Sequence, residues 1–281
     1  MKKCHLFLFV TYCSLINSVS FGQFTSIADD FSSISTLTGS TPDSGLSAWQ
    51  NSTGTSGAIG TSGGSAKLLT TSNESTQLNF ASSDLTTGTY YLGFDFSVSA
   101  TGSISPNDTI QSIAGFRIGT ASSGSIVASF GVFRPSGNAQ TFSGSPSTTT
   151  SQFVVGIFTG ASLNAASSSL TEWAVPLSRG TTFRAVLGLN LDSDRLGLWI
   201  NPISVTSTYV ELTGLTTNAR AIFLRAGNAS TGDIDLDNLI VSQDFSAAAI
   251  PEPATFAFIT ALATAASIAF RRQKPARLWT T

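Results

Sequence analysis

Apolar and polar residues alternate one by one along much of the middle of the chain. In the segment 89–99, TYYLGFDFSVS, every second residue from Tyr90 to Val98 is apolar. The residues between them are Tyr, Gly, Asp and Ser. Because successive side chains of a β-strand point to opposite faces of a sheet, this alternation predicts a half-buried strand. Helical periodicity is almost absent from the same region.

The same alternation recurs in four further segments, which span 125–133, 183–190, 195–201 and 233–241. Loops rich in Gly, Ser and Thr lie between such segments, for example at 51–65 and 143–151. Many strands with polar, Gly-rich turns are typical of a sandwich or barrel. Alternation with one solvated face is typical of antiparallel sheets. We therefore predict an all-β ectodomain that forms a single antiparallel β-sandwich.

Three short motifs follow one another in a recognisable order. ADDF stands at 28–31, LNLDSDRLGLWINP at 189–202 with a hairpin turn at 191–194, and DIDLDNLIVSQDF at 233–245. This order resembles the concanavalin-like (laminin G-like) jelly rolls of exported bacterial proteins. The resemblance implies a jelly-roll-like sandwich in which the first and last strands lie side by side. It also implies a glycan- or protein-binding role and no catalytic residues.

The N-terminal segment has the layout of a secretory signal peptide. Lys2 and Lys3 precede an apolar run from Cys4 to Ile16, and small residues follow it. We expect cleavage near position 21 or 23. The alternative is an uncleaved anchor helix, which the short run disfavours because a span needs about 20 apolar residues.

A second apolar run, 254–270, contains no charge, Gly or Pro. As a helix it would be about 25 Å long, at the low end for crossing a hydrocarbon core. A basic tail, 271–281, follows directly, and basic residues beside a span tend to stay on the cytoplasmic side. We predict one C-terminal transmembrane helix at 254–270 with the ectodomain outside. The alternative is a buried helix of a soluble domain.

The ending as a whole resembles the PEP-CTERM sorting signal of Gram-negative bacteria. The matching residues are Pro251, Glu252 and Pro253, then the apolar run, then Arg271 and Arg272. The tail beyond the arginines is longer than this pattern usually has. The resemblance implies that an exosortase-type processing enzyme in the membrane recognises the signal. It also implies a link to exopolysaccharide production.

These features predict three parts of the chain. They are a signal peptide at 1–22, a β-sandwich ectodomain at 23–248 and a sorting signal at 249–281. The protein is then expected to be exported and anchored in the inner membrane before sorting. After sorting it would reach the cell surface or extracellular matrix of a Gram-negative bacterium.

The ectodomain lacks the residues that many active sites need. Cys4, Cys13 and the only histidine, His5, all lie in the predicted signal peptide. The ectodomain therefore has neither disulfides, nor a Ser–His–Asp triad, nor a zinc site with His or Cys ligands. The GTSGG segment at 60–64 fits the G-x-S-x-G pattern, but no histidine is available to activate Ser62.

Charge argues against nucleic acid as a partner. Residues 23–250 contain eight Lys and Arg but fifteen Asp and Glu. Phosphate binding needs basic patches, which this balance disfavours.

Two carboxylates are candidate calcium ligands. Asp237 lies in an alternating Asp-x-Asp-x-Asp run at 233–237, and Asp30 lies near the start of the ectodomain. If the two ends of the domain are adjacent, Asp30 and Asp237 could bind Ca²⁺ together with backbone carbonyls. The alternative is a solvated strand face. No other cofactor is expected.

Trp199 is the candidate ligand-binding residue, because an exposed Trp on a sheet face can stack on sugars. The alternative is that a loop covers Trp199 and the side chain adds buried area. We predict a non-catalytic surface or matrix protein with polysaccharide as its candidate ligand.

An alternative function is a carbohydrate-active enzyme, a glycosidase or lyase, that uses paired carboxylates. The candidate carboxylates are Asp95, Glu172, Asp192 and Glu211, and no sequence pattern orders them into a pair.

Overall fold

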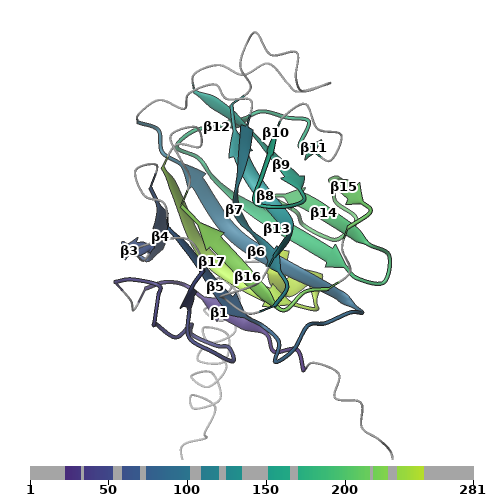
Figure 1. Ribbon diagram of the computed structural model, residues 1–281. Helices are drawn as coiled ribbons and strands as arrows, with labels where there is room; N and C mark the ends of the chain where they lie inside the picture. Colours follow the sequence, from purple (N-terminus) through teal and green to yellow (C-terminus); the bar gives the residue numbers. More distant parts are fainter. Residues whose placement is uncertain are drawn as a thin grey trace, which may run out of the picture.

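The computed structural model describes residues 23–32, 35–52, 59–69, 74–101, 109–119, 125–134, 151–164, 170–215, 218–226 and 233–249. Within these ranges the chain forms strands and one short helix, α1 (Phe245–Ala249) (Figure 1). None of the helical structure in these ranges is long and apolar enough to cross a membrane. The predicted signal peptide lies outside the described residues. So does the predicted sorting signal beyond Ala249, including Pro251, Glu252, Pro253, Arg271 and Arg272.

The strands form two antiparallel sheets. The first sheet has the order β15 (Tyr209–Thr213), β14 (Arg195–Ile200), β13 (Thr182–Asn190), β6 (Thr89–Val98), β17 (Ile234–Ser242), β4 (Ser65–Leu68) and β3 (Gly60–Ser62). A further strand, β1 (Ile27–Asp29), pairs with β17.

The second sheet has the order β11 (Thr171–Glu172), β9 (Gln152–Phe158), β8 (Ile126–Phe133), β7 (Thr109–Arg117), β16 (Ala221–Arg225), β5 (Ser75–Asn79) and β2 (Gln50–Asn51). Two short strands add to it, since β10 (Ser162–Asn164) pairs with β7 and β12 (Leu177–Ser178) pairs with β9. The chain crosses between the sheets from β5 to β6, from β6 to β7, and on both sides of β16. These crossings give the expected jelly-roll-like sandwich.

The alternating residues of β6 explain the main core. Tyr90, Leu92, Phe94, Phe96 and Val98 are all buried between the sheets. Phe130 of the second sheet lies 5.4 Å from the Phe94 ring and 5.3 Å from the Phe96 ring, centroid to centroid. Such edge-to-face aromatic packing stabilises the core beyond the burial of area. The predicted all-β sandwich is confirmed.

The ends of the domain meet as expected. β1 pairs antiparallel with β17, and Ile27 lies opposite Val241. The predicted hairpin turn at 191–194 connects β13 to β14. In this turn the Asn190 Oδ1 atom accepts hydrogen bonds from the backbone N–H groups of Asp192 and Ser193.

The expectation of one solvated face per sheet is wrong in two places. All residues of β9 from Phe153 to Phe158 are buried, and Val154 and Phe158 belong to a second apolar cluster on the far side of their sheet. In the first sheet, α1 packs against the outer face and covers Val186 of β13. Alternation identifies the two faces of a strand, but it does not show whether another segment covers the second face.

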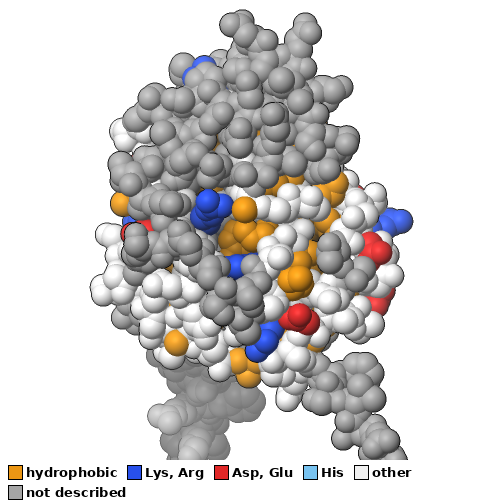
Figure 2. All heavy atoms as spheres, in the orientation of Figure 1, with side chains coloured by type: hydrophobic (Ala, Val, Ile, Leu, Met, Phe, Trp, Pro, Cys, Tyr) orange, Lys and Arg blue, Asp and Glu red, His pale blue; other side chains and the backbone are white. Residues whose placement is uncertain are grey.

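Charged side chains are sparse on the surface. In the orientation of Figure 1, hydrophobic side chains gather near the middle of the view, with basic and acidic side chains around them (Figure 2). Charged residues make up 11% of the chain. Exposed ion pairs contribute little to stability in any case, so the fold depends on its core and on the hydrogen bonds between strands.

Candidate functional site

A groove of about 250 Å³ lies on the outer face of the first sheet. Most of it is formed by alternate positions on β6, β13, β14 and β15, because residues two apart along a strand share one face of a sheet. Ser193 and Val205 come from the connections between these strands. The described residues that line it are Thr89, Tyr91, Gly188, Asn190, Ser193, Arg195, Gly197, Trp199, Val205, Tyr209 and Glu211. We call this site the outer-face groove.

Two glycines make room for the aromatic side chains of the groove. Gly188 and Gly197 lie opposite each other on β13 and β14. A Cβ atom on Gly197 would lie 2.6 Å from the Trp199 ring, and one on Gly188 would lie 2.9 Å from the rings of Trp199 and Tyr91. Any larger residue at these positions would push the aromatic rings away from the sheet.

Trp199 forms the base of the groove. Its side chain is only 6% exposed, and its Nε1 atom donates a hydrogen bond to the Val205 carbonyl at 3.2 Å. The ring packs edge-on against Phe245 of α1, with centroids 5.1 Å apart. The residue predicted to bind ligand therefore lies in the groove, but mostly as a support beneath it. Its contact with a ligand remains a prediction.

Tyr209 is the exposed aromatic residue of the groove. It lies opposite Trp199 on β15, and the two rings stack with centroids 4.9 Å apart and planes 20° apart. Tyr209 is 47% exposed. One face of its ring is thus held by Trp199 while much of the side chain meets solvent. Sequence analysis missed this residue, because its position opposite Trp199 depends on the connection between β14 and β15.

An ion pair lies among the polar residues that line the groove. The Nη1 atom of Arg195 lies 3.1 Å from Oε1 and 3.4 Å from Oε2 of Glu211. Both residues are partly exposed, on the adjacent strands β14 and β15. A guanidinium offers five N–H donors and a carboxylate accepts several hydrogen bonds. The groove thus combines an aromatic surface with a donor and an acceptor.

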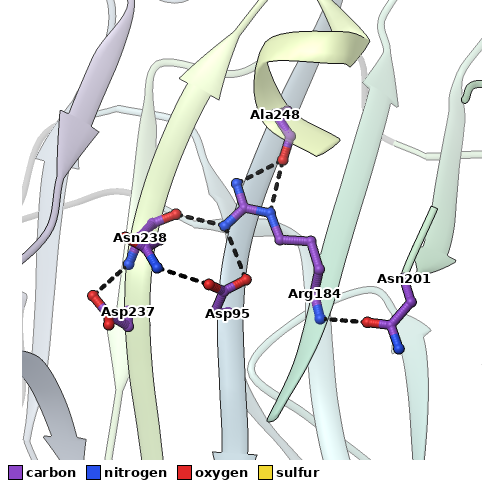
Figure 3. Close-up of polar contacts among 6 residues, drawn as sticks. All are labelled: Asp95, Arg184, Asn201, Asp237, Asn238 and Ala248. Atoms are coloured by element: carbon purple, nitrogen blue, oxygen red, sulfur yellow. Dashed lines mark hydrogen bonds and ion pairs between the residues drawn. The ribbon is translucent and has the colours of Figure 1, made fainter. Parts of the chain in front are cut away.

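A buried polar network joins α1 to the same sheet (Figure 3). The guanidinium of Arg184 donates to the Ala248 carbonyl from Nε at 2.9 Å and from Nη2 at 2.6 Å. Its Nη1 atom donates to the Asn238 carbonyl at 2.6 Å and lies 3.3 Å from Oδ1 of Asp95. Burial lowers the pKa of Arg184, and the charge of Asp95 partly offsets this effect. Arg184 thus fixes α1 beside the groove.

Asp95, one of the candidate catalytic carboxylates, belongs to this network. Asn238 donates from Nδ2 to its Oδ2 atom at 2.8 Å. Asp237 lies opposite Asp95 on the neighbouring strand, immediately before a β-bulge. Burial raises the pKa of Asp237, and the charge of Asp95 adds to this effect. Asp95, Asp235 and Asp237 line a second hollow of about 200 Å³.

The four predicted catalytic carboxylates do not gather at one place. Glu211 is in the outer-face groove on β15, whereas Asp95 is on β6, with β13 and β14 between them. Glu172 belongs to the second sheet. Asp192 accepts a hydrogen bond from the backbone N–H of Gly88 in the turn region. The carboxylate that does lie opposite Asp95 is Asp237.

Asp30 lies in a group of carboxylates with Asp29 and Asp43, whose oxygen atoms are within 4.8 Å of one another. Asp237 is not a member of this group, although the charge of Asp30 contributes to its raised pKa. Calcium binding by Asp30 and Asp237 therefore remains a prediction.

Burial raises the pKa of Asp29 to about 6, although hydrogen bonds from Trp49 and Phe31 favour its charged form. The charges of Asp43 and Asp30 raise it further. The carboxylate accepts from Trp49 Nε1 at 2.7 Å and from the Phe31 backbone N–H at 2.9 Å.

The raised pKa of Asp29 predicts a pH dependence of stability. The folded state binds the proton of Asp29 more tightly than the unfolded state, whose pKa is near 3.8. The stabilisation from Asp29 is therefore fully present below about pH 4 and is lost as pH rises through about 6. Asp29→Asn should flatten the profile of unfolding free energy between pH 4 and 7, measured by urea unfolding. Parallel profiles for the two proteins would contradict this prediction.

No protein-family model matches the chain, and no curated protein matches it. Several solved structures are similar to this chain. One is the exoplasmic/lumenal domain of VIP36 in a Ca²⁺/Man-bound form, which is 13% identical. The match covers 78% of this chain and 90% of that chain, with a TM-score of 0.42. Lectin II from Ulex europaeus has 13% identity over 78% and 97%, TM-score 0.38. The binding domain of botulinum neurotoxin DC has 10% identity and a TM-score of 0.36, and the match spans 65% of this chain but only 40% of that chain.

None of these TM-scores reaches 0.5. The two-sheet architecture therefore rests on the strand pairing of this chain.

Proposed function

We propose that this chain is an exported, non-catalytic surface or matrix protein that binds polysaccharide through the outer-face groove. The observation that carries the proposal is Tyr209, a half-exposed aromatic residue beside the Arg195–Glu211 pair. A pyranose ring has an apolar face of C–H groups and a rim of hydroxyls. The Tyr209 ring suits the face, and the charged pair suits the hydroxyls, which both donate and accept hydrogen bonds.

The aromatic residues of the groove are held in place before a ligand binds. Trp199 stacks behind Tyr209, and Phe245 packs against Trp199. The Arg184 contacts to Ala248 hold the helix that carries Phe245. Rigid binding residues lose little conformational freedom on binding, which favours affinity.

Tyr209→Ala should weaken polysaccharide binding by up to about tenfold, because an aromatic contact contributes roughly 0.5–1.5 kcal/mol beyond the area it buries and 1.4 kcal/mol is a factor of ten. The matched control is Val175→Ala, which removes an exposed apolar side chain that does not line the groove. A glycan array followed by titration measures both variants. Equal affinity of Tyr209→Ala and the control would count against the groove.

The C-terminal part of the proposal rests on the sequence. The chain is proposed to be held in the membrane by 254–270 until an exosortase-type enzyme processes it near Pro251, Glu252 and Pro253. Protease shaving of intact cells tests the export, and a full-length chain in the cytosol that resists protease would contradict it.

Two variants of the sorting signal test the processing step. Glu252→Ala, or Arg271 and Arg272 both changed to Ala, should leave the ectodomain folded but block processing in the native host. Mass spectrometry of the mature C-terminus reports the outcome. A processed end identical to that of the wild type in both variants would leave these residues without a sorting role.

A carbohydrate-active enzyme is the second candidate function. The observation that favours it is the cross-strand pair of Asp95 and Asp237, because paired carboxylates in different environments can act as acid and base. A hydrolysis screen beside the glycan array distinguishes the two functions. The non-catalytic proposal predicts binding without product, whereas turnover that Asp237→Asn abolishes would favour the enzyme.

A further inference from the structure

Building on the proposed function, we infer that the outer-face groove selects neutral polysaccharides over anionic ones, and that Glu211 sets this selection. Arg195 is the one basic residue among the described residues that line the groove. Both carboxylate oxygens of Glu211 lie within 3.4 Å of the Nη1 atom of Arg195. A carboxylate on the ligand would therefore compete with Glu211 for the same cation.

Acidic groups around the groove also disfavour an anionic ligand. Asp192 and Asp194 flank the lining residue Ser193 in the turn between β13 and β14. On another side, burial raises the pKa of Tyr91 and the nearby charge of Asp244 raises it further. These acidic groups outnumber the single cation, so the field at the groove repels a polyanion.

A neutral sugar can form hydrogen bonds to the same ion pair. One hydroxyl can accept from the guanidinium of Arg195 while its neighbour donates to Glu211, and the ion pair need not separate. Tyr209 supplies the apolar contact beside them. The ion pair thus serves as a joint donor and acceptor rather than as a site for a negative charge.

Glu211→Gln tests this inference directly. The substitution keeps the size of the side chain but removes the charge that neutralises Arg195. The matched control is Asp235→Asn, which removes one negative charge from another exposed pair, that with Lys67 at 2.9 Å, on the same sheet but outside the groove. Both variants change the net charge equally, so only a local effect of Glu211 separates them.

The full chain is titrated with a neutral β-glucan and with a polyuronate of matched length. The wild type should bind the neutral polymer more tightly. Glu211→Gln should raise the affinity for the polyuronate at least fivefold relative to Asp235→Asn, and about 0.5 M salt should cancel most of this gain by screening. Affinity for the neutral polymer should not rise in Glu211→Gln, because the amide that replaces the carboxylate is a weaker acceptor for the sugar hydroxyls.

A preference of the wild-type protein for polyuronate would overturn the inference, as would equal effects of Glu211→Gln and Asp235→Asn. In both cases the groove would still be the binding site if Tyr209→Ala weakened binding. If neither polymer nor any other glycan binds, or if Tyr209→Ala has no effect, the proposed function fails and the inference fails with it.

Discussion

Arg184→Ala should lower the free energy of unfolding by about 3–5 kcal/mol, the cost of removing one partner from a buried charge pair. The Asp95 carboxylate, whose side chain is 15% exposed, would lose its cation. The carbonyl oxygens of Ala248 and Asn238 would also lose their donors. An unsatisfied buried polar group adds to the cost because it has also lost its hydrogen bonds to water.

The matched control for Arg184→Ala is Arg195→Ala on the same sheet. Arg195 also pairs with a carboxylate, but its side chain is 52% exposed. Exposed pairs contribute about 0–1 kcal/mol, so this control should cost little. Equilibrium urea unfolding measures both losses. Similar small losses in the two variants would show that the Arg184 network does not hold α1.

Gly93→Ala should have the second large effect. The new Cβ atom would overlap the Ala248 carbonyl oxygen and would lie 2.7 Å from Nη2 of Arg184. Forcing an atom into a packed site costs about 1–3 kcal/mol, and here α1 must move to relieve the clash. Because Phe245 of α1 packs against Trp199, binding at the groove should weaken as well.

Gly60→Ala provides the control for Gly93→Ala. Gly60 is in β3 of the same sheet, and a Cβ atom there would have no neighbour closer than 4.0 Å. Its effect should be below about 0.5 kcal/mol, as for most surface changes. Thermal unfolding gives the stabilities, and limited proteolysis after Phe245 reports whether α1 has detached. An equally protected α1 in both variants would contradict the proposed displacement.

The strands could be predicted because the alternation of apolar and polar residues that indicates them is local in the sequence. Alternation along β6 places Phe94 and Phe96 on the core face, and the structure buries both. The pairing of the first and last strands agreed with the order of short motifs along the chain.

The burial of part of the outer face of the first sheet under α1 could not be predicted in the same way. Alternation places Arg184 and Val186 on the face expected to meet solvent, yet both are buried beneath or beside α1. A helix of five residues is too short to show a helical period in the sequence. The role of Arg184 therefore emerges only when β13, β6, β17 and α1 are assembled.

The groove was predictable only in part. The sequence indicated Trp199 as a candidate binding residue because it is an aromatic residue on a predicted strand. Tyr209 did not, because the connection between β14 and β15 sets which residue lies opposite Trp199. The need for glycine at 188 and 197 also depends on the positions of rings from neighbouring strands.

Hydrogen exchange with and without a bound neutral polysaccharide tests the central claim most directly. A ligand in the outer-face groove should slow amide exchange in β14 and β15 (residues 195–200 and 209–213), where Arg195, Trp199, Tyr209 and Glu211 lie. Exchange in β8 and β9 of the second sheet should stay unchanged. Slower exchange confined to the second sheet, or no change in either sheet under saturating ligand, would contradict the assignment of polysaccharide binding to this groove.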